Sequence, residues 1–198
     1  MYRRILCTSI LFLLTAAALC ACGNDDSDRE LTLDIQEAFR SMERWSGTAE
    51  LTADYGQRVY SYTVSFSGTS RDGMNLTITA PEEVAGITAS IKEGQTVLSY
   101  DGIRLETGPL NPEGMSPLDA IPAVFSAMQS GYIAETSSET LGREDLLRIS
   151  CRDAENPPGE GVETVLWFHK GNKALQAAEI RNDGFTVVRC RFFDVIYA

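Results

Sequence analysis

From residue 45 to the end of the chain, apolar and polar residues repeatedly alternate, and this period of two limits the fold more than any other feature. The clearest run places Tyr60, Tyr62, Val64 and Phe66 on one face, with serine and threonine residues between them. Because successive side chains of a strand point to opposite faces, each run predicts a half-buried strand of an antiparallel sheet. Similar runs begin near residues 49, 74, 87, 162 and 188.

Turn sequences separate these runs, and each contains a glycine that tolerates a positive φ. They lie at residues 71–73, 93–94, 101–102, 170–172 and 182–184. We therefore expect about ten or eleven strands joined as a meander. A sheet of this size curls under its own twist, so one apolar face becomes concave and needs a cover.

A first amphipathic helix is predicted before the strands. Ser27 and Glu30 have the spacing of a capping box. The apolar residues that follow recur at helical spacing and form one stripe, which consists of Leu31, Ile35, Ala38, Phe39 and Met42.

A second helix is predicted in the middle of the chain. Ser116 is a suitable N-cap, and Pro117 stands at the first helical position. The pattern continues to Gly131, while Pro122 predicts a kink or a break. Together with the strands, the two helices predict an α+β fold, a curved antiparallel half-barrel with helices covering its concave face.

The first 21 residues have the organisation of an export signal, with two arginines ahead of an apolar run of about 15 residues. That run is shorter than the roughly 20 residues that span a membrane. The tetrapeptide at 19–22, Leu-Cys-Ala-Cys, resembles the lipobox of bacterial lipoproteins. The resemblance implies that Cys22 begins the mature chain and carries a diacylglycerol anchor with palmitate-type acyl chains. The alternative is an ordinary cleaved signal with a coincidental cysteine.

The lipid anchor predicts a location on the extracytoplasmic face of the cell membrane. Residues 22–30 are polar and acidic, and we expect them to form a solvated tether. Residues 31–198 then form one domain, which is an ordinary size for a single core.

The charge balance excludes one large class of partners. The chain has 17 Lys+Arg against 28 Asp+Glu, a net charge of −11, whereas a nucleic-acid binder needs a basic excess. The single histidine, His169, precedes a predicted turn, where we expect an exposed residue and no general base. The sequence contains no phosphate-binding glycine loop and no zinc-binding cysteine pair. We predict a protein that is not an enzyme and that uses no metal and no cofactor.

Two cysteines, Cys151 and Cys190, remain in the exported domain. Both lie in predicted strands on apolar faces. Export makes a disulfide between them feasible, and two buried free thiols are the other interpretation. Spacing in the sequence does not decide between them, because a disulfide needs the two Cα atoms within a narrow range of distance.

The order of elements resembles a known family. An N-terminal helix and strands are followed by Asn-Leu-Thr-Ile-Thr-Ala-Pro at 75–81, Val-Leu-Ser-Tyr-Asp-Gly at 97–102, a central helix and Phe-Asp-Val at 193–195. This order resembles the LolA/LolB-type lipoprotein-carrier fold, in particular its lipid-anchored, GerS-like members of Gram-positive and spore-forming bacteria. The resemblance covers roughly residues 31–198. It implies an eleven-stranded half-barrel whose inner surface holds acyl chains or is filled by side chains.

Two functions follow from these expectations. In the first, the half-barrel binds an apolar ligand, such as a lipid or the acyl chain of a lipoprotein. The residues expected to line that cavity are Tyr60, Tyr62, Val64, Phe66, Leu76, Ile78, Phe125 and Met128. In the second, the same residues form a packed core, and the protein is a scaffold that positions or activates an enzyme of the cell envelope. A continuous apolar cavity supports the first function, and a filled barrel with an exposed apolar or strand-edge patch supports the second.

Overall fold

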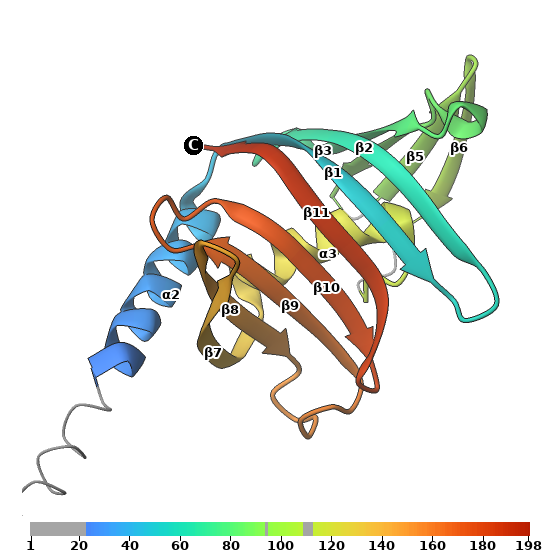
Figure 1. Ribbon diagram of the computed structural model, residues 1–198. Helices are drawn as coiled ribbons and strands as arrows, with labels where there is room; N and C mark the ends of the chain where they lie inside the picture. The colour runs from blue at the N-terminus through green and yellow to red at the C-terminus, as the bar shows by residue number, and fades with distance from the viewer. Residues whose placement is uncertain (1–22, 94, 109–112) are drawn as a thin grey trace, which may run out of the picture.

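The computed structural model describes residues 23–93, 95–108 and 113–198. Within these ranges eleven strands form one antiparallel sheet, in the order β6-β5-β4-β3-β2-β1-β11-β10-β9-β8-β7 (Figure 1). The predicted sheet is therefore confirmed. The strands are β1 (Arg44–Asp54), β2 (Val59–Thr69), β3 (Gly73–Ala80), β4 (Thr88–Lys92), β5 (Gln95–Tyr100), β6 (Ile103–Gly108), β7 (Tyr132–Leu141), β8 (Glu144–Arg152), β9 (Val162–His169), β10 (Leu175–Asn182) and β11 (Phe185–Tyr197), with a short 3-10 helix, η1 (Glu82–Val84), before β4.

Two meanders, β1 to β6 and β7 to β11, are joined by pairing between the first and last strands. In β1 and β11, Leu51 lies opposite Cys190 and Ala53 opposite Val188. The backbone of the last residue, Ala198, also forms hydrogen bonds in both directions with Arg44. This pairing makes one continuous sheet from two consecutive sets of strands.

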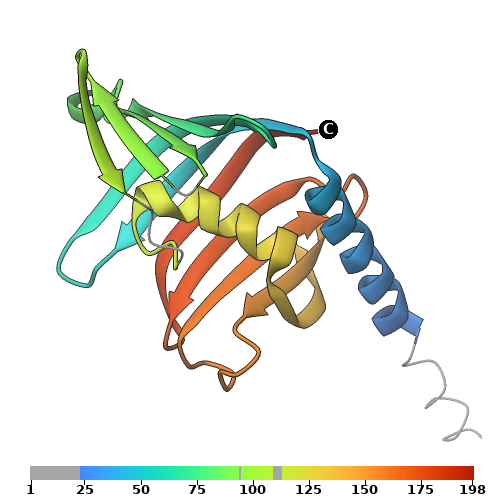
Figure 2. The ribbon, with the colours of Figure 1, turned by 180° about the vertical axis from the view of Figure 1, so that it is seen from behind.

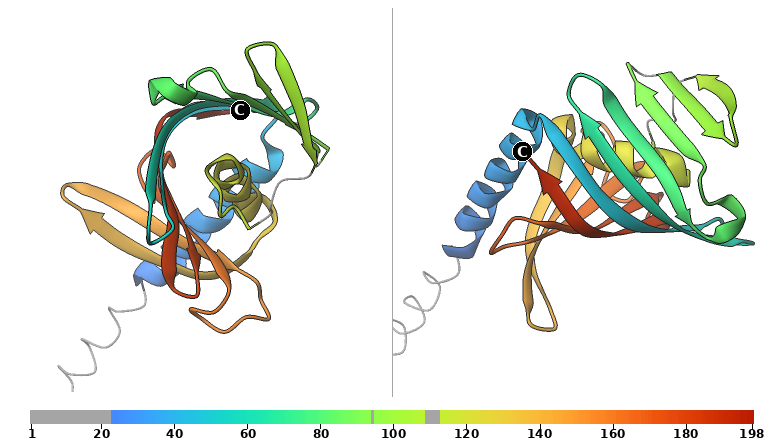
Figure 3. Two further views of the ribbon diagram at one scale, coloured as in Figure 1. Left: turned by 90° about the vertical axis from the view of Figure 1, so that its right-hand side faces the viewer. Right: turned by 90° about the horizontal axis from the view of Figure 1, so that it is seen from above.

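The sheet curls around helix α3 (Pro117–Ser130), as two views of the ribbon show (Figures 2 and 3). This helix contacts β1 and β8 to β11 on their concave side. Helix α2 (Gly23–Ser41) packs against α3, β7 and β8 at one end of the half-barrel. The predicted half-barrel with helices covering its concave face is confirmed.

Helix α3 has the ends that its sequence predicts. The side chain of Ser116 accepts a hydrogen bond from the backbone N–H of Asp119, as an N-cap does. At the other end the N–H of Gly131 donates to the carbonyl oxygen of Ala127. Pro122 does not split the helix, which is one uninterrupted element. Pro122 lacks an N–H and so removes one backbone hydrogen bond, and the helix continues through it.

The predicted signal peptide and the predicted lipid-bearing Cys22 lie outside the described residues. The predicted tether requires correction from residue 23 on, because α2 already begins at Gly23, four residues before the predicted cap Ser27. Asp28 was expected in solvent, yet it is buried and paired with Lys170. This partner lies far away in the sequence and provides a charge that the local pattern does not contain. Acidic residues in the first turns also suit the positive end of a helix dipole.

The core occupies the space between the concave face and the two helices. Alternate residues of the strands enter it, as the period of two predicts, and the predicted stripe of α2 contributes Ile35 and Phe39. Among the largest fully buried side chains are Phe39, Phe168, Leu51, Leu76, Ile121, Met128, Leu147 and Ile149.

Candidate functional site

A cluster of aromatic rings packs around Phe125 of α3 on the concave side of the half-barrel. Its ring centroid lies 5.5 Å from that of Phe39, 5.7 Å from that of Phe66 and 6.2 Å from that of Trp45. Phe66 in turn contacts Phe192 edge to face at 6.1 Å. These separations are those of directly packed rings. The cluster ties α2, α3, β1, β2 and β11 together.

Six of the eight residues expected to line a ligand cavity lie in this packed core, namely Val64, Phe66, Leu76, Ile78, Phe125 and Met128. They come from β2, β3 and α3 and are brought together as predicted. None of these six lines any of the four surface hollows described for residues 23–93, 95–108 and 113–198. The other two predicted residues do, since Tyr62 lines one hollow and Tyr60 another.

Tyr60 and Tyr62 lie further along the same face of β2, toward the rim. Their rings stack with centroids 6.5 Å apart, and Tyr55 contacts Tyr60 at 6.1 Å. Tyr60 is 37% exposed, whereas Tyr62 is half-buried against the core. The hydroxyl of Tyr55 donates to the carbonyl oxygen of Met115 at 2.9 Å, and burial is the main cause that raises the pKa of Tyr55. The tyrosines therefore form a rim next to the start of α3.

Cys151 and Cys190 are free and buried, so the structure decides against the disulfide. Cys190 lies in β11 opposite Ala178 of β10, which lies opposite Leu166 of β9, while Cys151 lies in β8. Three strand spacings of about 4.8 Å separate the two thiols, which exceeds the Cα separation of a disulfide. Burial raises the pKa of each thiol to about 12.

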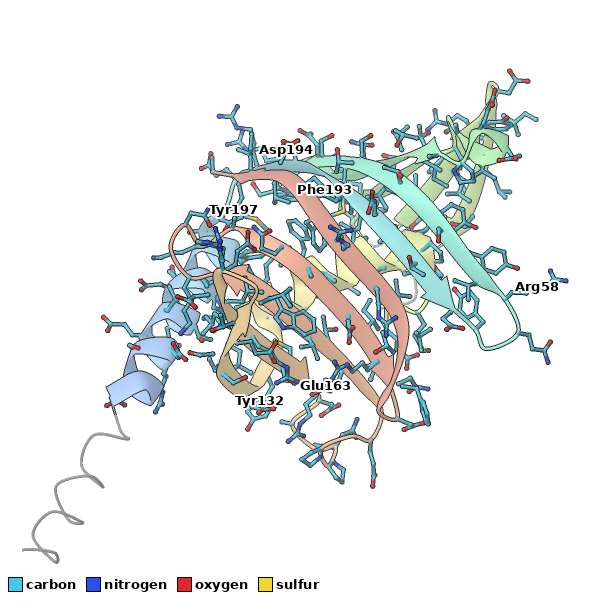
Figure 4. The ribbon with its side chains drawn as sticks, viewed as in Figure 1. Arg58, Tyr132, Glu163, Phe193, Asp194 and Tyr197 are labelled. Atoms are coloured by element: carbon cyan, nitrogen blue, oxygen red, sulfur yellow. The ribbon has the colours of Figure 1, made fainter. Side chains whose placement is uncertain are left out.

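A groove of about 550 Å³ lies between α2 and β7. Helix α2 contributes Arg29, Leu33 and Arg40, and the strand contributes Ile133 and Tyr132. Figure 4 labels Tyr132. Arg40 donates through Nε to the carbonyl oxygen of Gln129 at 2.9 Å. Because β7 is the last strand of the sheet, the backbone groups on its outer side have no strand partner in the described chain. The groove thus combines a few apolar side chains, Leu33 and Ile133 among them, with polar and charged ones such as Asp26, Gln36 and Glu135 and with backbone groups that have no strand partner.

A second hollow, of about 500 Å³, lies on the outer face of the sheet. Leu141, Trp167 and Phe193 line part of it, and Figure 4 marks Phe193 on β11. The indole Nε1 of Trp167 donates to Glu139 at 2.8 Å. Exposed charged residues, Arg191 among them, surround these apolar groups.

An ion-pair network covers the outer face of β8, β9 and β10. Glu179 accepts from Arg181 at 2.6 Å and from Arg189 at 3.1 Å, and Ser150 donates to Glu163. Burial opposes the ionisation of Glu179, but these arginines outweigh it and lower the pKa of the carboxyl. Beneath the network, Val165 is completely buried. These charges link neighbouring strands on the outer face of the sheet.

His169 ends β9, as predicted, but it is half-buried rather than exposed, and its Nδ1 accepts a hydrogen bond from the N–H of Gly171 at 3.0 Å. This contact makes it part of the turn. In the part of the chain that the structure describes, no three His, Cys, Asp or Glu side chains gather where a metal ion could bind. The same residues include no helix with both the length and the apolar character needed to cross a bilayer.

Comparison with known proteins gave matches only among solved structures; no family model and no curated protein matches the chain. An uncharacterised conserved protein from Thermus thermophilus has a TM-score of 0.52 at 9% identity, over 87% of this chain and 88% of that one. A LolA superfamily protein from Nitrosomonas europaea has a TM-score of 0.43 at 10% identity, over 84% and 91%. The structure of the CwlD amidase from Clostridioides difficile in complex with the GerS lipoprotein gives 0.42 at 14% identity, over 86% and 95%.

At these identities the similarity concerns the fold alone. The open eleven-stranded sheet with helices in its concavity is the architecture that the sequence resemblance implied, and the chain shares its fold with the uncharacterised Thermus thermophilus protein.

The groove beside α2 was not predicted from the sequence. A signal for it exists, since Leu33 is an apolar residue outside the buried stripe of α2 and is 56% exposed. Tyr132, at the start of β7, is a second large exposed residue. Only the packing of α2 beside the edge of the sheet makes them neighbours.

Proposed function

We propose that this protein is a lipid-anchored lipoprotein of the cell envelope that acts as a protein-interaction scaffold and performs no catalysis. The observation that carries the proposal is the packed concavity. Phe125 and its aromatic neighbours occupy the space in which a carrier of this shape would hold an acyl chain. Apolar side chains are instead left uncovered at the two edges of the sheet, which supports binding of a protein.

The proposed binding site is the groove between α2 and β7. Its occupant is an extended segment of an envelope protein that adds a strand to the free edge of β7. Backbone hydrogen bonds provide affinity, while Leu33 and Ile133 offer apolar contact to alternate side chains. The anchor at Cys22 holds this groove close to the membrane, because α2 begins one residue later.

Photo-crosslinking in the bacterium that makes the protein tests this site. A photoreactive amino acid replaces Leu33 on one wall of the groove or Ile133 on the other, and the matched control replaces Phe185, which is 78% exposed at the start of β11. We expect the same partner, joined through the same extended peptide, at both groove positions and not at Phe185. Different partners at the two walls, or equal labelling at Phe185, contradict the proposal.

The anchor has its own test. Replacement Cys22→Ala removes the residue that carries the lipid, and we expect the exported protein to move from the membrane to the soluble fraction. Membrane retention of a processed Cys22→Ala protein contradicts the assignment of Cys22.

A further inference from the structure

Strand β6 forms the margin of the sheet opposite β7, and it is exposed along almost its whole length (Figure 1). Ile103 is 72% exposed and Leu105 is 59% exposed. Leu105 lies opposite Leu98 of β5, a residue that packs against the core. The apolar concave face therefore continues to the margin, where Ile103 and Leu105 remain uncovered. Natural sheets protect such edges with proline, bulges or inward charges. Strand β6 has no proline, and its one irregularity against β5 lies beyond Glu106, between Glu106 and Gly108.

The backbone of β6 has the geometry to form hydrogen bonds with a further strand. Asp101 and Gly102 form a two-residue turn with φ values of 47° and 76°, which is the geometry of a type I′ hairpin. In such a hairpin the residues that flank the turn, Tyr100 and Ile103, exchange backbone hydrogen bonds with each other. Along β5 and β6, every second pair of opposite residues does the same, so Leu98 and Leu105 form the next hydrogen-bonded pair. Arg104 and Glu106 consequently direct their N–H and C=O groups away from β5, toward the free edge.

The side chains of these two residues indicate which strand fits. Neither Arg104 nor Glu106 has an ion-pair partner among the described residues. If a second β6 pairs antiparallel about Leu105, Arg104 of each copy lies opposite Glu106 of the other. Pairing centred on Arg104 or on Glu106 places like charges opposite each other, which is unfavourable. The charges therefore favour one register, and in it the strand is complementary to itself.

We propose that β6 is the interface of a homodimer, in which the β6 strands of two copies pair antiparallel about Leu105 and join two half-barrels into one sheet. Such an interface is isologous, since the same residues contribute from both copies. The interface is held together by backbone hydrogen bonds of Arg104 and Glu106 and by two Arg104–Glu106 ion pairs. The two Leu105 side chains also contact each other. This dimer leaves the β7 edge free, so its presence or absence is independent of the scaffold function.

A cysteine at the two-fold axis tests the pairing. In the proposed register Leu105 faces its own copy in a non-hydrogen-bonded pair, whose Cβ separation of about 4.5–5.5 Å is close to that of a disulfide. We expect full-length Leu105→Cys protein, produced in cells and oxidised mildly, to form a covalent dimer that reduction dissociates. Leu141→Cys is the matched control, because Leu141 is 71% exposed at the tip of the β7–β8 hairpin. A monomeric Leu105→Cys protein, or equal crosslinking of both variants, overturns the proposal.

Charge reversal in the same background tests the register. Arg104→Glu or Glu106→Arg alone places like charges opposite each other twice per dimer, and we expect the crosslinked fraction to fall about fivefold or more. The double variant restores opposite charges, so its crosslinking should return to the starting level. The pairing is contradicted if the single variants crosslink to the same extent as the starting protein. It is also contradicted if the double variant folds but its crosslinked fraction stays low.

Discussion

The carboxylate of Asp28, in the second turn of α2, is ion-paired with the ammonium group of Lys170, at the turn between β9 and β10. Ser138 of β7 donates to the same carboxylate. Asp28 is almost completely buried. These contacts join the beginning of α2, six residues after Cys22, to the body of the half-barrel. The helix is thereby held in position as one wall of the groove proposed to bind a partner.

Removal of the charge at Asp28 is expected to destabilise the protein. Asp28→Asn leaves the Lys170 ammonium group partly buried without its counter-ion, and we expect a loss of about 1–3 kcal/mol in the free energy of unfolding. Denaturant titration measures this loss. The matched control is Asp26→Asn, an exposed residue of the same helix, for which we expect a change within about 0.5 kcal/mol. Equal effects of the two substitutions are inconsistent with a structural ion pair.

The same pair predicts how stability depends on pH. Burial opposes ionisation of Asp28, but hydrogen bonds from Lys170 and Ser138 and the charge of Lys170 outweigh it, so the pKa lies below its ordinary value of 3.8. A carboxyl whose pKa is lowered by folding stabilises the protein above the unfolded pKa, and this stability is lost as the pH falls through the folded pKa. Below about pH 4, wild-type protein should therefore lose more stability than Asp28→Asn. Parallel curves for the two proteins contradict this assignment.

Truncation of Phe125 tests whether the concavity is filled. Phe125→Ala removes the ring that contacts Phe39, Trp45 and Phe66, and we expect a cost of about 3–5 kcal/mol in the free energy of unfolding. Phe185→Ala is the control, because Phe185 is 78% exposed at the start of β11. A cost for Phe125→Ala no larger than that for Phe185→Ala shows that the ring borders open space.

The two buried thiols are expected to resist alkylation in the folded protein. Burial raises the pKa of Cys151 and Cys190 to about 12, so very little thiolate forms at neutral pH, and the reagent has no access. Mass spectrometry of peptides after iodoacetamide treatment should find both residues unmodified, and both modified after unfolding in guanidinium without reductant. Failure of the unfolded protein to react without reductant indicates a disulfide and contradicts the structure.

The strands and helices were predictable from the sequence because their causes are local. Alternation such as that of Val64 and Phe66 depends on neighbouring residues, and so does the cap that Ser116 provides for α3. The extent of α2 depends instead on Lys170, a partner 142 residues distant from Asp28. Likewise, the same apolar residues can line a ligand cavity or form a packed core. Which of the two they form depends on how closely α3 approaches the sheet, and the spacing of residues in the sequence does not specify that distance.

The free edges were missed for the same reason. Leu105 and Glu106 belong to an ordinary alternating run, and only the order of strands shows that β6 lies at the margin of the sheet. Since β6 contains no proline to mark it as an edge strand, its alternation looks like that of a strand in the middle of the sheet.

Native mass spectrometry of the lipidated protein, released from detergent micelles, tests the central claim that the half-barrel is filled and carries no lipid. The predicted result is the mass of the mature chain with its covalent anchor, or twice that mass for the dimer, with no further lipid at full occupancy. A non-covalent lipid retained one per chain would show that the concavity opens to hold a ligand, and would contradict the scaffold function in favour of a carrier.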